Sequence, residues 1–231
     1  MSDVSSNWVP TICPIRIWRL GWVAAAFLVL AAGAAAQSAQ QDPAQPASPV
    51  AAQNQEAPYH PITGRQRIEW FVDQTFAPAH LGGGVFVAAF GTARDTPPEY
   101  RGTWAGFGKR FASREAGVAL SNAMEAELGA MWGEDPRYFR EPDESFGGRV
   151  KNVVWQTFFA RRRDGSFQLA YARYAAITGN NFISNAWRPA READTPHALY
   201  RTGWGFLGRM GSNAFDEFWP DVKRRVFHHR H

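Results

Sequence analysis

The residues best suited to chemistry lie in one short run, residues 132–140, which reads WGEDPRYFR. Glu134 and Asp135 are adjacent carboxylates among aromatic side chains, where a carboxyl group can have a raised pKa and act as a general acid. Arg137 could hold an anionic substrate in its planar fork, and Tyr138 adds a phenol. These four residues are the candidate catalytic set of a hydrolase. We favour the alternative that the aspartate–proline step ends a helix and the charges pair locally, because no second half of a catalytic set is visible.

A second group of polar residues consists of asparagines in apolar helical surroundings. The tripeptide Ser-Asn-Ala occurs at residues 121–123, 184–186 and 212–214. Asparagine is a poor residue inside a helix because its amide competes for backbone hydrogen bonds, so its presence indicates buried side-chain partners. One hypothesis is a polar ligand pocket, and the hypothesis that we favour is hydrogen bonding between helices. The candidate binding residues are Asn180, Asn181, Asn185 and Asn213.

No recognisable cofactor or metal motif is present in the sequence. His80 and His197 stand alone, and the remaining histidines of the C-terminal half crowd into residues 228–231, which we interpret as a His-rich tail. A phosphate-binding loop, a dinucleotide fingerprint and a nucleophile elbow are all missing. The net charge of +4 comes from arginines spread along the chain, not from a basic cluster. The sequence therefore predicts no cofactor, no metal and no nucleic-acid partner.

Helices must position these residues, and residues 59–227 are long enough for one domain with a core. Apolar spacing predicts a first helix over 64–76, and Thr96-Pro97-Pro98-Glu99 resembles a capping box that would begin a helix reaching Trp132, with an interruption near Ser113. Residues 150–159 fit a strand or a buried helix, and we favour the helix. Two further helices are expected over 167–187 and 195–219, the last ended by the following proline.

Small residues recur four positions apart in these predicted helices, as in the pairs Gly102/Gly106, Gly129/Gly133 and Gly208/Ser212. Such spacing lets two helix backbones approach closely, in lipid or in a soluble bundle. The fold class predicted is mainly α, a compact helical bundle with small-xxx-small packing.

The strongest membrane candidate in this domain is residues 74–93, which contain no Asp, Glu, Lys or Arg. Pro78, His80 and the triple glycine at 82–84 weaken it as a span. A core helix or buried hairpin is the interpretation that we favour.

The N-terminal residues have the pattern of an export signal. Arg16 and Arg19 precede an uncharged apolar run that ends in three alanines at 34–36. We expect residues 1–36 to be a cleavable signal peptide, with an uncleaved anchor as the alternative. Residues 37–58 are rich in Gln, Ala, Pro and Ser, and we expect a disordered tether. The only cysteine, Cys13, lies in the predicted signal.

The motifs Gly106–Phe111, Glu134–Arg140, Ser184–Ala186 and Glu217–Asp221 occur in an order that resembles a family of uncharacterised exported bacterial envelope proteins. The resemblance covers residues 59–226 and implies a signal peptide and one mainly helical domain, with no assigned activity. We expect an exported periplasmic or cell-envelope protein with a non-enzymatic structural or binding role, whose partners are membrane lipid or other envelope proteins. The alternative is an envelope hydrolase that uses Glu134 and Asp135.

Overall fold

A computed structural model describes residues 59–142 and 144–227. The predicted signal peptide, tether and His-rich tail lie outside these residues. The order of elements is α2 (Gly64–Phe76), α3 (Pro78–Ala93), η1 (Pro98–Tyr100), α4 (Trp104–Trp132), β1 (Glu134–Asp135), α5 (Phe146–Phe158), β2 (Phe159–Arg162), β3 (Phe167–Leu169), α6 (Tyr171–Ile183), η2 (Ser184–Ala186), η3 (Ala190–Glu192) and α7 (Thr195–Phe227). The prediction of a mainly α fold is confirmed.

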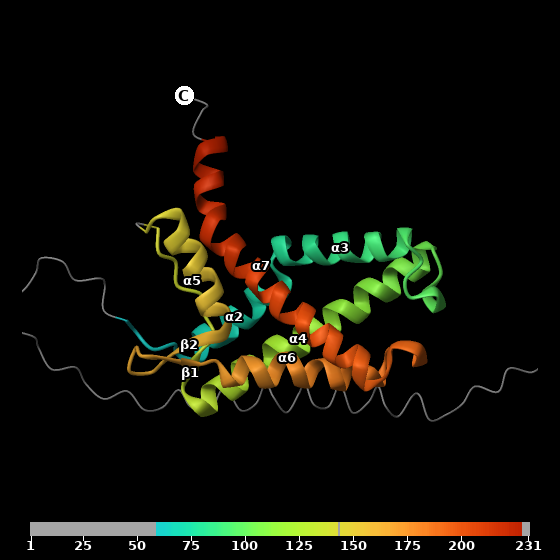
Figure 1. Cartoon of the computed structure of the whole chain (residues 1–231), viewed down its shortest axis with the longest axis horizontal. Helices are drawn as coiled ribbons and strands as arrows, with labels where there is room; N and C mark the ends of the chain where they lie inside the picture. Colours follow the sequence, from blue (N-terminus) through green and yellow to red (C-terminus); the bar gives the residue numbers. More distant parts are fainter. Residues whose placement is uncertain (1–58, 143, 228–231) are drawn as a thin grey trace, which may run out of the picture.

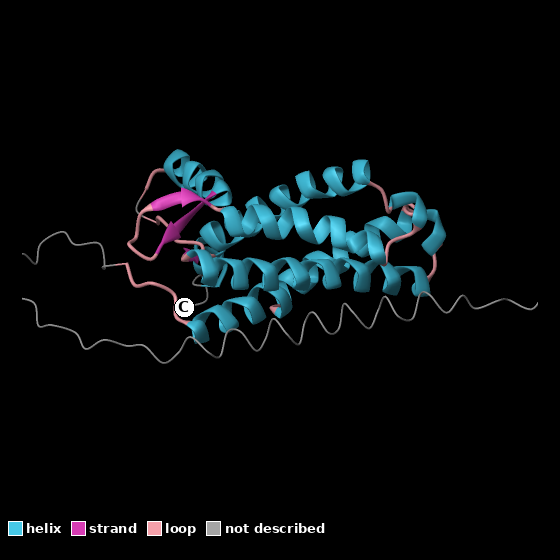
Figure 2. Cartoon of the chain, turned by 90° about the horizontal axis from the view of Figure 1, so that it is seen from below, coloured by secondary structure: helices cyan, strands magenta, loops and turns pink. Residues whose placement is uncertain are grey.

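The long helix α4 is the centre of the arrangement. It packs against α2, α3 and α6, and α7 packs on both α6 and α5. Figure 1 shows α3, α4 and α6 extended along the long axis, with α7 crossing them, and Figure 2 shows α5 and the small sheet gathered at one end of the bundle. The C-terminal half of α7 passes beside α5, and its last turns extend past the other helices (Figure 1).

Local sequence signals set several helix ends. Thr63 caps α2 in a capping box with Gln66, and the helix spans the residues that apolar spacing predicts. Ala77 has an extended backbone, so the helix is interrupted there and α3 begins at Pro78. The hydroxyl of Ser145 accepts from the Gly148 N–H and begins α5.

The predicted start of the long helix α4 is wrong. Thr96 does not cap it; a 3-10 turn follows, and the hydroxyl of Thr103 accepts from the Gly106 N–H to cap α4. The predicted interruption near Ser113 is also wrong, because α4 continues through this buried residue to Trp132. The helix ends at Gly133, whose φ of 75° is the left-handed conformation that glycine adopts without strain.

A small antiparallel sheet, in the order β1-β2-β3, replaces part of two predicted helices. Residues 150–158 are helical as predicted, but Phe159 begins β2 and pairs with Leu169. The prediction of a helix from Phe167 is therefore wrong for its first residues. They form β3, because pairing with β2 satisfies their backbone groups before α6 begins at Tyr171.

The predicted end of the last helix at Trp219 is also wrong, since α7 continues through Pro220 to Phe227. Proline removes one backbone donor and distorts the turn before it. In that turn the Glu217 carbonyl accepts hydrogen bonds from Arg140 (2.9 Å) and Arg149 (2.7 Å). Tertiary contacts thus stabilise a turn that the local sequence disfavours.

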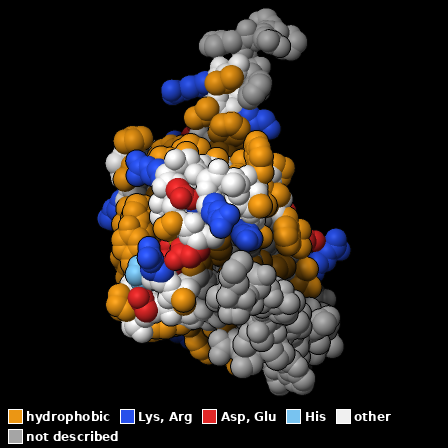
Figure 3. All heavy atoms as spheres, turned by 90° about the vertical axis from the view of Figure 1, so that its right-hand side faces the viewer, with side chains coloured by type: hydrophobic (Ala, Val, Ile, Leu, Met, Phe, Trp, Pro, Cys, Tyr) orange, Lys and Arg blue, Asp and Glu red, His pale blue; other side chains and the backbone are white. Residues whose placement is uncertain are grey.

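The interior of the described domain is polar and its surface is rich in large apolar side chains. Most buried apolar residues are alanines, whereas Arg173, Glu125, Glu134, Asp135 and Glu217 are each less than 5 % exposed. Exposed large apolar residues occur on all six α-helices of the described domain. Only Gly84 and Ala88 of α3 are buried, so the favoured prediction that residues 74–93 form a core helix or buried hairpin is wrong. Figure 3 shows one end of the molecule, where charged side chains gather near the centre and a few lie at the edges among hydrophobic ones. Buried polar groups and exposed apolar patches are the informative departures from ordinary folds.

Small residues allow close packing, though not always where the four-residue pairs predict it. A side chain on Gly205 of α7 would come within 2.6 Å of Ile177 on α6, so this glycine permits that helix contact. Gly106 instead sits against the carbonyls of Tyr100 and Arg101 in the preceding loop. A Cβ placed on Gly208 would have no atom within 4 Å, so this glycine faces open space.

Candidate functional site

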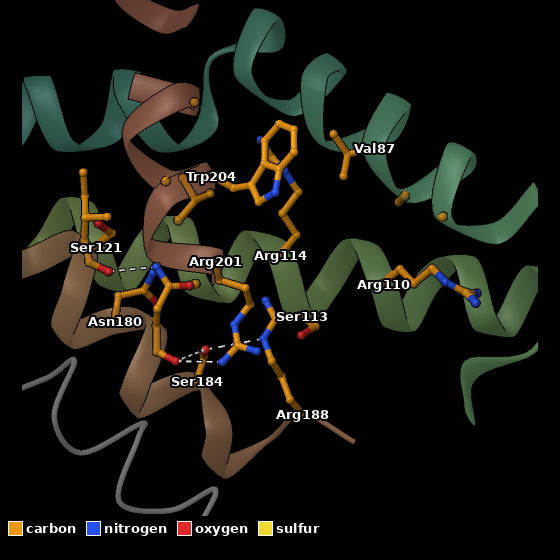
Figure 4. Close-up of a pocket in the computed structure, with 18 of the residues that line it drawn as sticks. Val87, Arg110, Ser113, Arg114, Ser121, Asn180, Ser184, Arg188, Arg201 and Trp204 are labelled. Carbon is orange, nitrogen blue, oxygen red and sulfur yellow. Dashed lines mark hydrogen bonds between the residues drawn. The ribbon is translucent and has the colours of Figure 1, made fainter. Parts of the chain in front are cut away.

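A cavity of about 510 Å³ lies where α3, α4, α6 and α7 meet. It exists because α3 packs on α4 while α7 packs on α5 and α6, which leaves room between α3 and α7. The volume falls within the range typical of small-molecule sites. Figure 4 shows its labelled residues projecting from all four helices and from the segment after α6.

One face of α4 forms much of the cavity wall. Arg110, Ser113, Arg114, Gly117 and Ser121 line it at spacings of three and four, which places them along one side of the helix. None of them was among the predicted site residues. Their polar and small character at helical spacing is the sequence signal by which this wall could have been found.

Arginine is the dominant charge of the cavity. Five arginines and two glutamates line it, together with His80. The arginines are Arg110, Arg114, Arg188, Arg201 and Arg209, and the glutamates are Glu125 and Glu192. Because the cationic groups outnumber the carboxylates, the interior favours an anion over a cation or a neutral polar molecule.

Two of these cations lie close together after α6. Figure 4 shows Arg188 and Arg201 side by side near Ser184. Arg201 donates to the carbonyls of Glu192 (2.7 Å) and Asn181 (3.0 Å), and Arg188 lies 3.6 Å from the Glu192 carboxylate. Burial lowers the pKa of both guanidinium groups, and the charge of Arg188 lowers the pKa of Arg201 further. The Glu192 carboxylate thus pairs with Arg188, while backbone carbonyls hold Arg201 beside it.

Four residues of the cavity carry buried polar atoms without a hydrogen-bond partner. These atoms are Ser113 Oγ, Asn180 Oδ1, Arg201 Nε and Arg209 Nε. Each such atom in a folded protein calls for an explanation, because leaving it unpaired costs about 1–3 kcal/mol. Their concentration around one cavity makes it the candidate functional site.

Two other cavity arginines have structural duties. The Arg110 guanidinium donates to the carbonyls of Thr96 (2.7 Å), Pro97 (2.9 Å) and Arg101 (2.8 Å), and so fixes the loop before α4. Arg209 donates to the Pro136 carbonyl at 2.6 Å and to the Glu125 carboxylate at 3.2 Å. These two positions therefore have little freedom to turn toward a ligand.

A buried ion cluster lies at the end of the cavity. The Glu125 carboxylate accepts from Arg173 (2.8 Å) and Arg209 (3.2 Å), which come from α6 and α7. Arg173 is 2 % exposed and also donates to the carbonyls of Gln156 and Thr157. This cluster joins α4, α6 and α7 to the end of α5.

The predicted binding asparagines do not converge on one pocket. Asn180 and Asn181 line the cavity, and the Asn181 amide donates to the Ile177 carbonyl at 2.8 Å. Asn185 lies beside the cavity and accepts from Arg201. Asn213 lies elsewhere and donates to Thr157 Oγ1 at 3.2 Å, an interhelix hydrogen bond of the kind that we favoured.

The predicted catalytic carboxylates lie outside the cavity lining and are saturated with donors. Glu134 accepts from the backbone N–H groups of Tyr171 (3.1 Å) and Ala172 (3.0 Å) at the start of α6, and from the Gln168 amide (3.1 Å). Burial raises the pKa of Glu134, and these N–H groups oppose that shift. The carboxylate satisfies the first turn of α6, where donors have no partner within the helix.

Asp135 is a second carboxylate whose two oxygens both accept hydrogen bonds, and it contacts the start of the described domain. It accepts from Arg137 (2.7 Å) and from the Tyr59 hydroxyl (3.0 Å). Burial and the nearby Asp135 carboxylate raise the pKa of Tyr59 to about 12. Arg137 also donates to the His60 carbonyl at 2.9 Å, so these groups join the start of the domain to the sheet.

Tyr138 belongs to a third cluster around Glu217 of α7. The Glu217 carboxylate is fully buried and accepts from Tyr138 (2.7 Å) and Arg149 (2.6 Å). Burial is the larger cause that raises the pKa of Tyr138, and the Glu217 carboxylate raises it further. The structure thus divides the four predicted catalytic residues among three clusters that join distant parts of the chain.

Among residues 59–142 and 144–227, no three His, Cys, Asp or Glu side chains are grouped so that they could hold a metal ion. No family model, curated protein or solved structure matches the chain. The site is therefore interpreted from its own geometry, and the resemblance to exported envelope proteins stays a prediction.

Proposed function

We propose that the protein is a non-enzymatic, membrane-associated protein of the cell envelope, whose apolar flanks contact lipid. The observation that carries the proposal is the inverted distribution of side chains, with ion pairs inside and large apolar groups outside. A single protein partner would need one apolar patch, whereas these groups occur on all six α-helices of the described domain.

Helix α3 is the part of the surface best suited to lipid. It has no Asp, Glu, Lys or Arg, and its exposed residues include Phe86 (71 %) and Phe90 (49 %). The stretch Gly64–Ala93 is the part of the described chain that is long and apolar enough to cross a membrane by length and composition. Because Ala77 interrupts the helix, a continuous membrane span is disfavoured. We propose instead that the flank of the bundle lies on the membrane, as interfacial helices do.

Membrane fractionation with a carbonate wash tests the proposal. We expect the wild-type chain to stay with the membrane and the double variant Phe86→Glu/Phe90→Glu to move into the soluble fraction. Arg191→Glu is the matched control, because it changes the net charge by the same amount at a residue whose side chain is 74 % exposed. Release of the wild-type chain by carbonate, or equal release of both variants, would contradict attachment through α3.

The hydrolase alternative keeps Glu134 and Asp135 as its candidates. No observation favours it as a second function, since both carboxylates are less than 3 % exposed and engaged by several donors.

A further inference from the structure

Large apolar side chains lie at the mouth of the cavity between α3 and α7. Val87 and Trp204 line the cavity, yet they are 53 % and 57 % exposed, so they also face outward. Figure 4 shows both side chains on the α3 side of the cavity, away from Arg188 and Arg201. The Arg114 guanidinium lies on this side too, against Gly84 of α3. A molecule entering here would meet Val87, Trp204 and Arg114 first, and Arg188 and Arg201 further in.

The arginines of the interior differ in how completely their donors are used. Arg110 and Arg209 are held by carbonyl groups, as described above. Arg188 has a long hydrogen bond to Ser184 (3.4 Å) and lies 3.6 Å from the Glu192 carboxylate. Arg201 donates to the Glu192 and Asn181 carbonyls and leaves its Nε without a partner. Arg114 pairs with its own neighbour Glu115 on α4, and its side chain is 33 % exposed. Arg188 can therefore turn toward an anion, while Arg201 adds charge beside it.

We propose that this cavity binds an amphiphilic anion, with its phosphate or carboxylate head against Arg188 and Arg201 and its apolar chain leaving between Val87 and Trp204. The buried Arg201 Nε, Ser113 Oγ and Asn180 Oδ1 are polar groups that an anion and its accompanying water would satisfy. The ligand chemistry is shared by anionic phospholipids and by free fatty acids, so the test separates these sources. The inference goes beyond the proposed function, because a free fatty acid could occupy the cavity without membrane attachment.

Binding to the full-length chain in dodecyl maltoside can be measured with radiolabelled dodecyl phosphate. We expect dodecyl phosphate to bind saturably, and inorganic phosphate and dodecanol, which each carry half of its chemistry, to compete at least tenfold more weakly. Displacement by phosphatidylglycerol identifies a phospholipid source, and displacement by oleate alone identifies a fatty-acid source. Equal competition by dodecanol would overturn the role of the arginines, and equal competition by inorganic phosphate would overturn that of the apolar mouth.

Two pairs of variants locate the binding. Arg188→Gln should weaken binding about tenfold, the loss expected for one charged contact, whereas Arg191→Gln on the exposed surface should leave it unchanged. Gly208→Leu should block the cavity, because a Cβ there meets open space, and Gly211→Leu, equally unobstructed but outside the cavity lining, should not. Unchanged binding in both Arg188→Gln and Gly208→Leu would overturn the proposal. Arg188→Gln should leave carbonate extraction unchanged, so failure of this inference is distinguishable from failure of membrane attachment.

Discussion

The Glu217 carboxylate shows how a single buried charge is stabilised in this protein. It accepts from Tyr138, from Arg149 and from the backbone N–H of Glu141, and its own carbonyl accepts from two arginines. Removing one partner of a buried ion pair costs more than the pair contributes, because the remaining charge is left without compensation.

We predict that Glu217→Gln lowers the free energy of unfolding by about 1–3 kcal/mol, because the charged hydrogen bonds to Tyr138 and Arg149 are weakened while Arg149 keeps Asp221. Chemical denaturation followed by circular dichroism measures this loss. Glu69→Gln is the matched control: it breaks an ion pair with Arg65 one helical turn away whose side chains are 54 % and 88 % exposed, so we expect less than about 0.5 kcal/mol. Equal losses in the two variants would contradict a special role for Glu217.

Asp221 gives the domain a defined response to acid. Hydrogen bonds from Arg224 and Arg149 lower the pKa of its carboxyl group to about 2. A carboxyl group whose pKa is lower in the folded than in the unfolded chain stabilises the fold at pH values above its unfolded pKa of about 3.9. That contribution is lost as the pH falls toward 2. We therefore predict that the stability difference between wild type and Asp221→Asn is largest above pH 4 and shrinks toward pH 2. Thermal denaturation across this range measures the difference, and a gap that is constant with pH would refute the coupling.

At the scale of elements, Glu134 supplies the cap that α6 lacks in its own sequence, since Ala170 at its N-terminus makes no side-chain cap hydrogen bond. We predict that Glu134→Ala increases hydrogen exchange at the backbone amides of Tyr171 and Ala172 and destabilises the domain by about 1–2 kcal/mol, the usual cost of losing a cap. Glu144→Ala, at an exposed carboxylate before α5, is the control. Normal protection of α6 in Glu134→Ala would remove the structural explanation of this residue and strengthen the hydrolase alternative.

The start of α4 depends on a glycine whose need is visible only in three dimensions. A Cβ on Gly106 would overlap the carbonyl oxygens of Tyr100 and Arg101, whereas nothing lies near a Cβ on Gly108. We predict that Gly106→Ala destabilises the protein by about 1–3 kcal/mol, since backbone must move. Gly108→Ala should stabilise it by about 0.5–1 kcal/mol through helix propensity. Thermal melts of the two single variants check the opposite signs, and shifts in the same direction would contradict the packing.

The elements that the sequence predicts correctly are those whose signals are local. Helix α2 has its capping box and apolar spacing within the segment 64–76, so both of its ends could be predicted. The strand β3 and the passage of α7 through Pro220 depend on β2, Arg140 and Arg149, which are far away in the sequence. Local patterns cannot report such partners.

The same limit applies to the candidate site. Asn180 could be chosen from the sequence because an asparagine in an apolar helix is conspicuous, and it does line the cavity. Arg188 and Arg201 could not, since surface arginines of ion pairs have the same local sequence character. Their proximity arises only when the segment after α6 folds back on α7.

At the scale of the whole molecule, the ionisable residues of the sequence suggest a water-facing surface, yet many of them lie in the interior. Glu125, Arg173 and Arg209 form one buried cluster, and Arg149 and Glu217 form part of another. Large side chains such as Phe86 and Trp204 are exposed in their place. Water solvates such a surface poorly, so the environment of the folded protein becomes part of its stability.

This distribution predicts that the state of association depends on amphiphiles. In buffer without detergent we expect the protein to self-associate through its apolar flanks, and in dodecyl maltoside we expect a smaller, defined particle. Size-exclusion chromatography with light scattering measures both states.

A chain without residues 1–36 is needed beside the full chain, because the apolar run of the predicted signal would associate by itself. If that shorter chain stays monomeric in plain buffer at micromolar concentrations, the exposed flanks do not require lipid. If it disperses only with detergent, and Phe86→Glu/Phe90→Glu reduces the association while Arg191→Glu does not, the apolar flank on α3 is the surface responsible.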